Sequence, residues 1–344
     1  MDMDNRAGLS RRGLLRALAA APALTLAAAP GDAQAASIQA ACIDATIAET
    51  RAALKDAQGT KLVILGTGAG PVPGQARHMT SHVMLHEGAA YVLDCGLGVT
   101  RQYARTGIPF SALNSIFITH HHPDHNIEYG PLLVLSWIGG MRQSVRAYGP
   151  PPLAQMTEDY LRSAKQTIAF WAEDFRMQPL GMIEVHELPQ AGSVMQDENV
   201  KVSSVLVQHP PVTPAYGYRF DFPDRSIAFS GDTVPLDAVA QMAKGADILV
   251  HEAIDMAAIE VQVRGMFPAG RVPAERLGII MAHMRADHSP TEDVGRIAED
   301  AGVKTLVLSH LAPGDNSVGN ETWRSAAAKH FSGQIIVASD LMVI

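Results

Sequence analysis

The chain has few cysteines, and charged residues are sparse and show no basic excess. Cys42 and Cys95 are the only two thiols among 344 residues, so a disulfide framework is excluded, and neither lies in a C-x-x-C pattern. One disulfide between Cys42 and Cys95 is an alternative, although the apolar strand before Cys95 favours a buried, unbonded thiol. Charged residues make up 18% of the chain and sum to −8, which does not suggest a basic surface for nucleic acid.

The N-terminus has the features of an export signal. The paired arginines Arg11 and Arg12 precede an alanine-rich apolar run over residues 17–29, and residues 33–35 read A-x-A, a typical cleavage site. Paired arginines before an apolar run resemble a twin-arginine signal. Because the run is short and is broken by Pro22, it is not expected to span a bilayer. We predict a signal over residues 1–35; a disordered or membrane-anchoring N-terminus is the alternative.

Removal of this segment has two consequences. Residues 1–35 carry four arginines and three aspartates, so about −9 remains on the mature chain. The mature protein is then expected to be periplasmic or secreted, without stable membrane association.

The remaining chain alternates short apolar strands with helices. A helical lead-in over 36–60 is followed by expected strands at 61–65, 82–86, 90–94, 115–119, 183–187, 201–208, 216–220, 226–229, 248–251, 305–309 and 334–337. Helical periodicity over 151–178 indicates an insertion into this pattern. The strands form an early and a late group, which favours two packed sheets covered by helices, in one α/β domain over 61–344.

A cluster of histidines and an aspartate follows the strand expected at 115–119. His120 and His122 lie two residues apart, so an extended backbone directs both imidazoles to one side. Asp124 and His125 come after Pro123, which stiffens the turn between the two pairs. Imidazole and carboxylate ligands suit zinc, and also manganese or iron.

Three later strands also end in a side chain that binds metals. They deliver His209, Asp232 and His310, each at the carboxyl end of its strand. Ligands from several strand ends are what a single site at a sheet edge requires. A solvated polar loop at 120–125 is the alternative, but it does not account for the later residues. We therefore predict one metal centre.

The pattern H-x-H-x-D-H, with Asp94 before it and His209, Asp232 and His310 after it in that order, resembles the metallo-β-lactamase superfamily. The resemblance extends from about Lys61 to the C-terminus. It implies an αββα sandwich of two mixed β-sheets flanked by helices. It also implies two bound divalent ions, with zinc the expected metal and manganese or iron the alternatives. It also implies the ligands: His120, His122 and His209 for one ion, Asp124, His125 and His310 for the other, and Asp232 between them.

The same resemblance implies a hydrolytic mechanism. Two divalent ions lower the pKa of a bridging water, so that hydroxide forms near neutral pH. Asp124 or Asp232 is expected to orient that hydroxide, and Asp94 to orient a metal ligand through a hydrogen bond.

Residues 287–291 and 250–253 resemble the ribonuclease Z branch of the superfamily. There the histidine that matches His288 protonates the leaving oxygen or stabilises its charge. His288 is therefore a third candidate catalytic residue; the alternative is that it only bonds its own loop. His251 is as well explained by a role in supporting the sheet. The other histidines are interpreted as structural or surface residues: His78, His82, His86, His121, His186, His283 and His330.

Charge and export lead us to expect a small substrate. Ribonuclease Z itself processes transfer RNA, but a charge of about −9 and an export signal oppose that substrate, so we predict no nucleic-acid partner. The loop at 66–73 with Arg77 resembles exported arylsulfatase-like members, which implies a small sulfate or phosphate ester. Arg77 either pairs with that anion or faces solvent. Phe170, Trp171 and Phe175 either line a pocket for an aryl group or pack a helix.

Two other activities stay open at this point. A lactonase or β-lactamase uses the same metals against a carbonyl carbon, although the match at His288 disfavours it. A periplasmic metal-binding protein without catalysis is disfavoured because all seven ligands are intact. A homodimer is compatible with the branch, but no segment of the sequence requires it.

Overall fold

The computed structural model describes residues 30–55, 58–72, 76–181, 183–265 and 273–344. The chain divides into two compact units, Met1–Ala45 and Thr46–Ile344, and the second contains every residue of the predicted metal site. Helix α2 spans Pro30–Lys55 and covers most of the predicted lead-in. Most of the predicted signal, residues 1–29, lies outside the described residues. Among the described helices, we find none with the length and apolarity needed to cross a bilayer.

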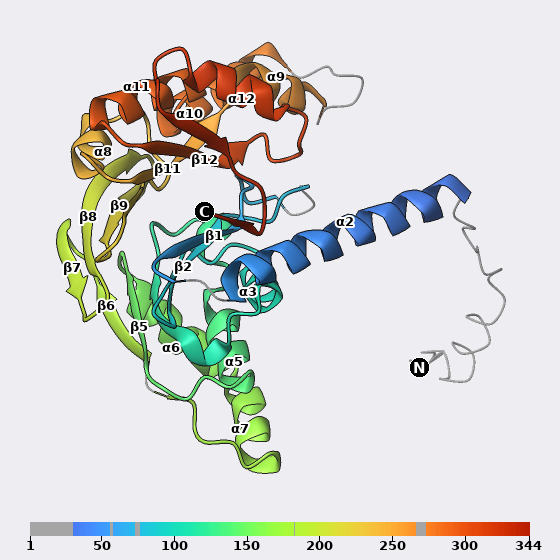
Figure 1. Cartoon of the computed structure of the whole chain (residues 1–344), viewed down its shortest axis with the longest axis vertical. Coiled ribbons are helices and arrows are strands. Elements are labelled where there is room, and N and C mark those ends of the chain that lie inside the picture. The colour runs from blue at the N-terminus through green and yellow to red at the C-terminus, as the bar shows by residue number, and fades with distance from the viewer. Residues whose placement is uncertain (1–29, 56–57, 73–75, 182, 266–272) are drawn as a thin grey trace, which may run out of the picture. The chain divides into compact units, whose positions relative to one another are not determined.

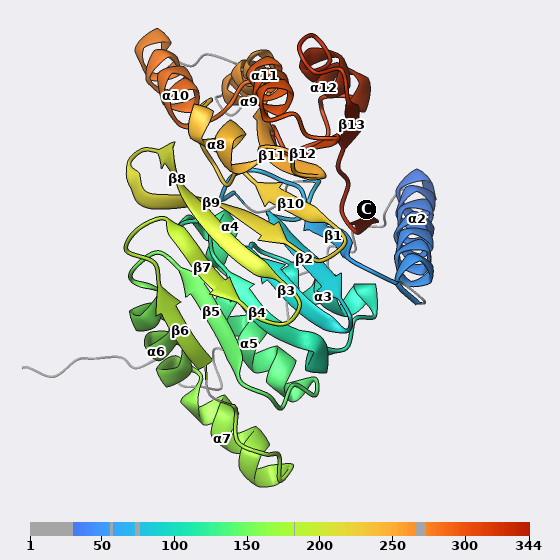
Figure 2. The same cartoon turned by 60° about the vertical axis from the view of Figure 1, so that its left-hand side comes forward.

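Two seven-stranded sheets make up the larger unit, within the described residues (Figures 1 and 2). The first sheet has the order β14-β1-β2-β3-β4-β5-β6 and the second β13-β12-β11-β10-β9-β8-β7. The first contains β1 (Lys61–Gly66), β2 (Ser81–His86), β3 (Ala89–Leu93), β4 (Leu113–Phe117), β5 (Val145–Gly149), β6 (Ile183–Glu187) and β14 (Met342–Val343). The second contains β7 (Gly192–Gln196), β8 (Lys201–His209), β9 (Val212–Asp221), β10 (Ser226–Phe229), β11 (Ile248–Ile254), β12 (Thr305–Ala312) and β13 (Gln334–Val337).

Both sheets are mixed, as the sequence predicts. Strands β14, β1, β2 and β3 pair antiparallel, whereas β3, β4, β5 and β6 pair parallel. In the second sheet, β7 to β10 are antiparallel and β10 to β13 are parallel. Strand β11 is buried along its whole length, because a parallel strand in a layered fold is covered on both faces.

Aromatic side chains fill the space between the sheets. Phe117 of the first sheet meets Phe220 of the second edge to face, with ring centroids 5.0 Å apart. Tyr218 joins the same buried cluster, and its hydroxyl donates to the backbone oxygen of Ile118. Edge-to-face packing of such rings stabilises a core beyond the area that it buries. The contact holds the strand end before His120 against the second sheet.

Helices cover the outer faces of the sheets. Helices α3 (Val99–Thr106) and α6 (Leu153–Ser163) contact the first sheet, and α5 (Tyr129–Ile138), the short η2 (Phe110–Ala112) and α7 (Lys165–Asp174) pack beside them. The short α4 (Pro123–Asn126) follows β4 at the site. On the second lie α8 (Asp237–Met242), α11 (Thr291–Ala301) and α12 (Asn320–Ala327), which contact one another or the strands beneath. The four layers confirm the predicted αββα sandwich.

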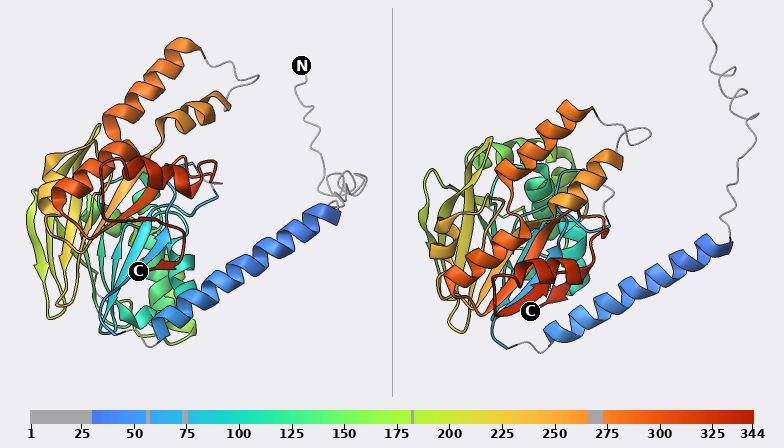
Figure 3. Two further views of the ribbon diagram at one scale, coloured as in Figure 1. Left: turned by 45° about the horizontal axis from the view of Figure 1, so that its top comes forward. Right: turned by 90° about the horizontal axis from the view of Figure 1, so that it is seen from above.

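A further pair of helices stands apart from these layers. Helices α9 (Met256–Gly265) and α10 (Ala274–Asp287) pack against each other at one end of the second sheet (Figure 3). Their shared apolar cluster includes Ile259, Val263 and Met281. The sequence indicated no role for these two helices, which form one wall of the site.

Candidate metal centre

The predicted ligands reach one place from the ends of four strands. Strand β4 leads through Thr119 into His120, and Pro123 at the start of α4 turns the chain so that Asp124 and His125 face back. His209 ends β8, and Asp232 follows β10. His310 is the extra residue of a bulge in β12, because Ser309 pairs with Glu252 and Leu311 with Ala253. A bulge redirects a side chain, and here it turns His310 into the site.

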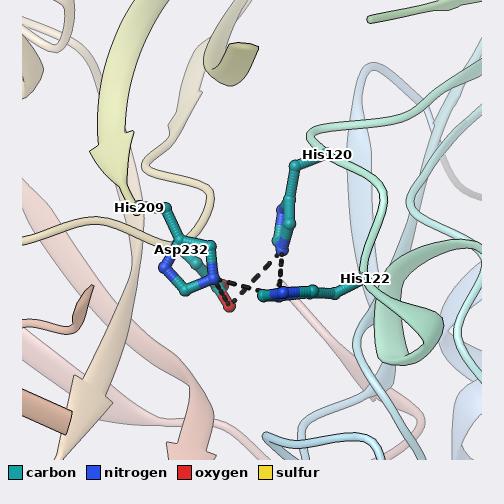
Figure 4. A group of neighbouring side chains, drawn as sticks. All are labelled: His120, His122, His209 and Asp232. Atoms are coloured by element: carbon teal, nitrogen blue, oxygen red, sulfur yellow. Dashed lines mark hydrogen bonds and ion pairs between the residues drawn. The ribbon is translucent and has the colours of Figure 1, made fainter. Parts of the chain in front are cut away.

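Three imidazoles and one carboxylate form the first group (Figure 4). The Nδ1 atom of His122 lies 3.0 Å from Nε2 of His120 and 3.0 Å from Nε2 of His209. Asp232 Oδ2 lies 3.9 Å from His120 Nε2 and 3.8 Å from His209 Nε2. The four ligand atoms therefore converge on one point.

A second group lies on the other side of Asp232. It consists of Asp124, His125 and His310, all buried. Asp232 Oδ2 lies 3.2 Å from Nε2 of His125 and 3.1 Å from Nε2 of His310. Asp124 Oδ2 lies 3.4 Å from the same atom of His310. One oxygen of Asp232 therefore borders both groups.

The donor set fits a divalent cation. The buried Nε2 atoms of His125 and His310 form no hydrogen bond within the described residues. Burial of such nitrogens is costly unless a partner is supplied, and converging imidazoles and carboxylates suit a metal such as zinc. Burial raises the pKa of Asp232, but the neighbouring His125 and His310 outweigh it and hold that pKa well below its usual value. The carboxylate is thus in its ligating form.

Hydrogen bonds orient the ligands from behind. Asp94 Oδ2 lies 2.8 Å from Nδ1 of His125, and Asp94 Oδ1 accepts the backbone N–H of Thr119. His209 Nδ1 donates to the backbone oxygen of Asp287 at 2.9 Å. These contacts leave the Nε2 atoms of both histidines facing the centre, which is how proteins commonly hold metal-binding imidazoles. Asp94 therefore has the position that the sequence analysis assigned to it.

His288 lies at the centre, paired with a carboxylate that the sequence analysis did not single out. Its Nδ1 atom is 2.7 Å from Oε2 of Glu252, and it forms a group with Asp232 and His310. Burial lowers the pKa of His288, but the charge and hydrogen bond of Glu252 outweigh burial, so its pKa is raised. The H-E-A sequence at 251–253 was the available signal for Glu252. His288 does not merely bond its own loop.

The neighbouring His251 has a structural place. Its Nδ1 atom donates to the backbone oxygen of Glu252 at 2.8 Å, and its ring is fully buried. Burial lowers its pKa, so the ring is neutral at neutral pH. This agrees with the interpretation that His251 supports the sheet.

Two candidates for substrate contacts lie elsewhere. Arg77 Nη1 donates to Thr67 Oγ1 and to the backbone oxygen of Ala338, so it ties together two loops. The aromatic residues of the 151–178 segment pack against one another on and after α7; Trp171 and Phe175 stack with centroids 4.4 Å apart. None of these side chains lines the cavity at the metal centre. Of the three aromatic residues, Trp171 packs against the core of the first sheet, whereas Phe170 and Phe175 are more than half exposed.

A cavity of about 370 Å³ opens directly onto the ligands. Its floor includes His122, Asp124 and His310. The opposite wall is aliphatic and comes from α9 and α10, with the side chains of Ile259, Val263, Ile280 and Met284. Helices α9 and α10, together with the loops at 69–72 and 312–314, therefore line the apolar part of the cavity, and no described residue of 151–178 does so.

Comparisons with known proteins agree with this architecture. The family model described as "Beta-lactamase superfamily domain" matches residues 90–311. Ribonuclease Z of Mycobacterium bovis BCG is 32% identical over 285 residues, which cover 82% of this chain and 96% of the relative. Ribonuclease Z of Mycobacterium marinum is 30% identical over the same shares.

Solved structures show the same fold at lower identity. The metallo-beta-lactamase fold protein YhfI from Bacillus subtilis matches with a TM-score of 0.60 and 18% identity, over 83% of this chain and 100% of that one. Human tRNase Z, short form, matches with a TM-score of 0.59 and 22% identity, over 83% and 98% of the two chains.

These relatives correct the predicted substrate and partner. We expected a hydrolase of small sulfate or phosphate esters and no nucleic-acid partner, and the ribonuclease Z relatives contradict both expectations. The error has a physical origin. A net charge near −9 is a sum over the whole chain, whereas recognition of a polyanion depends on the local surface and on the charge of bound metal. The site, the fold and the relatives together show that the chain belongs to the beta-lactamase superfamily of metal-dependent hydrolases, in its ribonuclease Z branch.

Proposed function

We propose that this chain is a metal-dependent phosphodiesterase that cleaves RNA, with transfer RNA as its substrate class. The observation that carries the proposal is the Glu252–His288 pair beside Asp232 and His310. It is present in a chain that matches ribonuclease Z over 96% of the relative's length.

We further propose two zinc ions at the centre, one held by His120, His122 and His209 and the other by Asp124, His125 and His310. Asp232 lies between the two groups and would ligate both. Bound there, the ions would supply a hydroxide at neutral pH and charge to stabilise the transition state.

The leaving group favours RNA over an aryl ester. Cleavage of RNA releases a ribose hydroxyl, which is a strong base as an alkoxide and needs a proton as the P–O bond breaks. His288 is held by Glu252 with its Nδ1 atom engaged, so Nε2 is left to face the site as a donor. Asp124 accepts the backbone N–H of Gly70, which fixes its carboxylate where it lines the cavity.

The proposal is tested with metal-loaded full-length protein and an unprocessed transfer RNA transcript. We expect the native chain to cleave the transcript at a defined position and Asp232→Ala to lose this cleavage. Both proteins are also assayed with bis-p-nitrophenyl phosphate, a second phosphodiester. Hydrolysis of the chromogenic ester without any cleavage of RNA would overturn the RNA assignment. Inactivity toward both phosphodiesters in protein that contains metal would overturn the phosphodiesterase itself.

Export remains a proposal that rests on the sequence of residues 1–35: the paired Arg11 and Arg12, the apolar run over 17–29 and the A-x-A site at 33–35. We propose that the chain leaves the cytoplasm by a twin-arginine route, so that it would meet RNA outside that compartment. Cell fractionation of the native chain and of a variant with Arg11→Lys and Arg12→Lys tests this. Retention of only the variant in the cytoplasm is the expected result, and an equally cytoplasmic native chain would overturn export.

A further inference from the structure

The aliphatic wall over the metal centre has no partner in the reaction described so far. Ile259 and Val263 of α9 and Ile280 and Met284 of α10 face the same cavity as the ligands His122 and Asp124. A cavity of about 370 Å³ is within the size range of pockets that hold small molecules or parts of larger ones. Whatever occupies it lies next to the reacting phosphate, because the cavity is continuous with the ligand groups.

The chemistry of the lining restricts the occupant. Neither lysine nor arginine is among the described residues that line the cavity, and its polar side chains other than the proposed ligands are Gln262, His283, Asp287 and His288. A flanking phosphate would therefore be poorly compensated there, since phosphate contacts in proteins are made chiefly by cationic side chains and backbone N–H groups. An uncharged ring with apolar faces suits the aliphatic wall.

We propose that the wall formed by α9 and α10 holds one unpaired nucleobase of a nucleotide that flanks the scissile bond. This proposal rests on the proposed cleavage of RNA and specifies which part of the substrate is recognised. Unpaired bases of RNA are commonly splayed out and bound between apolar or aromatic side chains. Here one face of the base contacts Ile280 and Met284, which lie side by side on α10, and the phosphate lies over the ligands. The pocket therefore selects single-stranded RNA at the bond that is cleaved.

The chain offers a matched control for the wall. Ile280 lines the cavity, whereas its neighbour Ile279 is 63% exposed and does not line it. The same substitution at both positions separates the pocket from the general effect of a polar residue in α10. Ile280→Asn and Ile279→Asn are therefore compared, with Met284→Ala as a second pocket variant. Metal content and the thermal midpoint of each variant are measured first.

The substrate is varied in parallel with the protein. Once the cleaved bond of the RNA transcript is mapped, two further RNAs carry an abasic ribose on one or the other side of that bond. We expect loss of one base to lower kcat/KM of the native chain about tenfold, within the range for a single base contact. Ile280→Asn lowers kcat/KM about tenfold relative to the native chain on the intact RNA. On the abasic RNA that the native chain cleaves more slowly, the variant and the native chain have similar kcat/KM. Ile279→Asn leaves it unchanged.

Other outcomes contradict the assignment in distinguishable ways. If the native chain cleaves all three RNAs equally well, the base pocket is overturned and the proposed ribonuclease stands. If Ile280→Asn slows cleavage of intact and abasic RNA to the same extent, the pocket is also overturned. Met284→Ala provides the same comparison if Ile280→Asn does not fold. If metal-loaded native protein cleaves none of the RNAs, the proposed function fails, and this assignment fails with it.

Discussion

Asp94 and His125 form a buried pair in which Oδ2 of the carboxylate lies 2.8 Å from Nδ1 of the imidazole. The other oxygen of Asp94 accepts the backbone N–H of Thr119, next to His120. One carboxylate therefore positions ligands of both groups. Its backbone has a φ of 59°, a left-handed conformation that aspartate tolerates better than most residues.

Asp94→Asn is expected to weaken metal binding without abolishing the fold. The amide keeps the shape of the side chain but no longer offers a charged acceptor on both oxygens, so metal affinity falls roughly 10–100-fold. Competition titration with a chelating dye measures the change. Asp159→Asn, at an exposed pair with Arg162, is the control and leaves affinity unchanged. Equal affinities in both variants would contradict the role of Asp94.

Removal of metal is expected to lower the stability of the fold as well as its activity. Without a cation, the buried Nε2 atoms of His125 and His310 have only the carboxylate of Asp232 beside them and form no hydrogen bond within the described residues. At a free metal concentration about 1,000-fold above Kd, binding stabilises the folded state by about 4 kcal/mol. Thermal unfolding with and without a chelator measures this. If Asp232 ligates both ions, the chelator lowers the unfolding temperature of Asp232→Ala much less than that of the native chain. An equal decrease in both proteins would argue against this role of Asp232.

Glu252→Gln is expected to lower turnover of RNA while metal stays bound. In the native chain, the charge of Glu252 holds His288 in place and raises its pKa. The variant lacks that charge. Loss of a general acid costs roughly 10²–10⁴-fold in rate. A nitrophenolate leaves without a proton, so bis-p-nitrophenyl phosphate is affected much less. Parallel kcat measurements on the two substrates check this, and equal losses on both would show that the pair acts on the fold instead.

Gly96→Ala is expected to displace the turn that carries Asp124. A methyl group at this position would meet the backbone oxygen of Asp124 and the side chain of Met79, at 2.6 Å for the latter. Overpacking of this kind costs roughly 1–3 kcal/mol. Denaturant unfolding and metal content measure the effect. Gly278→Ala in α10, where a methyl group meets no atom within 4 Å, is the control and is neutral or stabilising.

Asp247 makes a contribution to stability that depends on pH. Its carboxylate accepts bonds from Lys304 Nζ and from the N–H and hydroxyl of Ser226, and these lower its pKa to about 2. Because the folded pKa lies below the unfolded value, the contribution is present above about pH 4 and is lost as pH falls toward about 2. Asp247→Asn therefore lowers the free energy of unfolding by about 1 kcal/mol or less at pH 7. The difference shrinks between pH 4 and pH 2.5; a constant difference would contradict this assignment.

Local patterns in the sequence predicted two packed sheets and a cluster of metal-type side chains, and the family resemblance carried by that cluster implied the αββα fold and the ligand set. His120, His122, Asp124 and His125 lie within six residues, so the backbone of one strand end and one turn determines how they point. The apolar strands in two groups were sufficient to predict two sheets, since alternation and burial are properties of short segments. Composition did not identify the substrate, because a net charge carries no information about position.

Only the tertiary structure decided what surrounds the metal centre. Glu252 meets His288 across 36 residues of chain, and α9 and α10 face the ligands only because the second sheet ends there. An apolar stripe on a helix predicts that the stripe is buried, but not which surface buries it, so Phe170 and Trp171 were as eligible as Ile280 and Met284. Strand periodicity and ligand spacing are local and were therefore readable in the sequence. The pairing of distant side chains follows from how the layers pack.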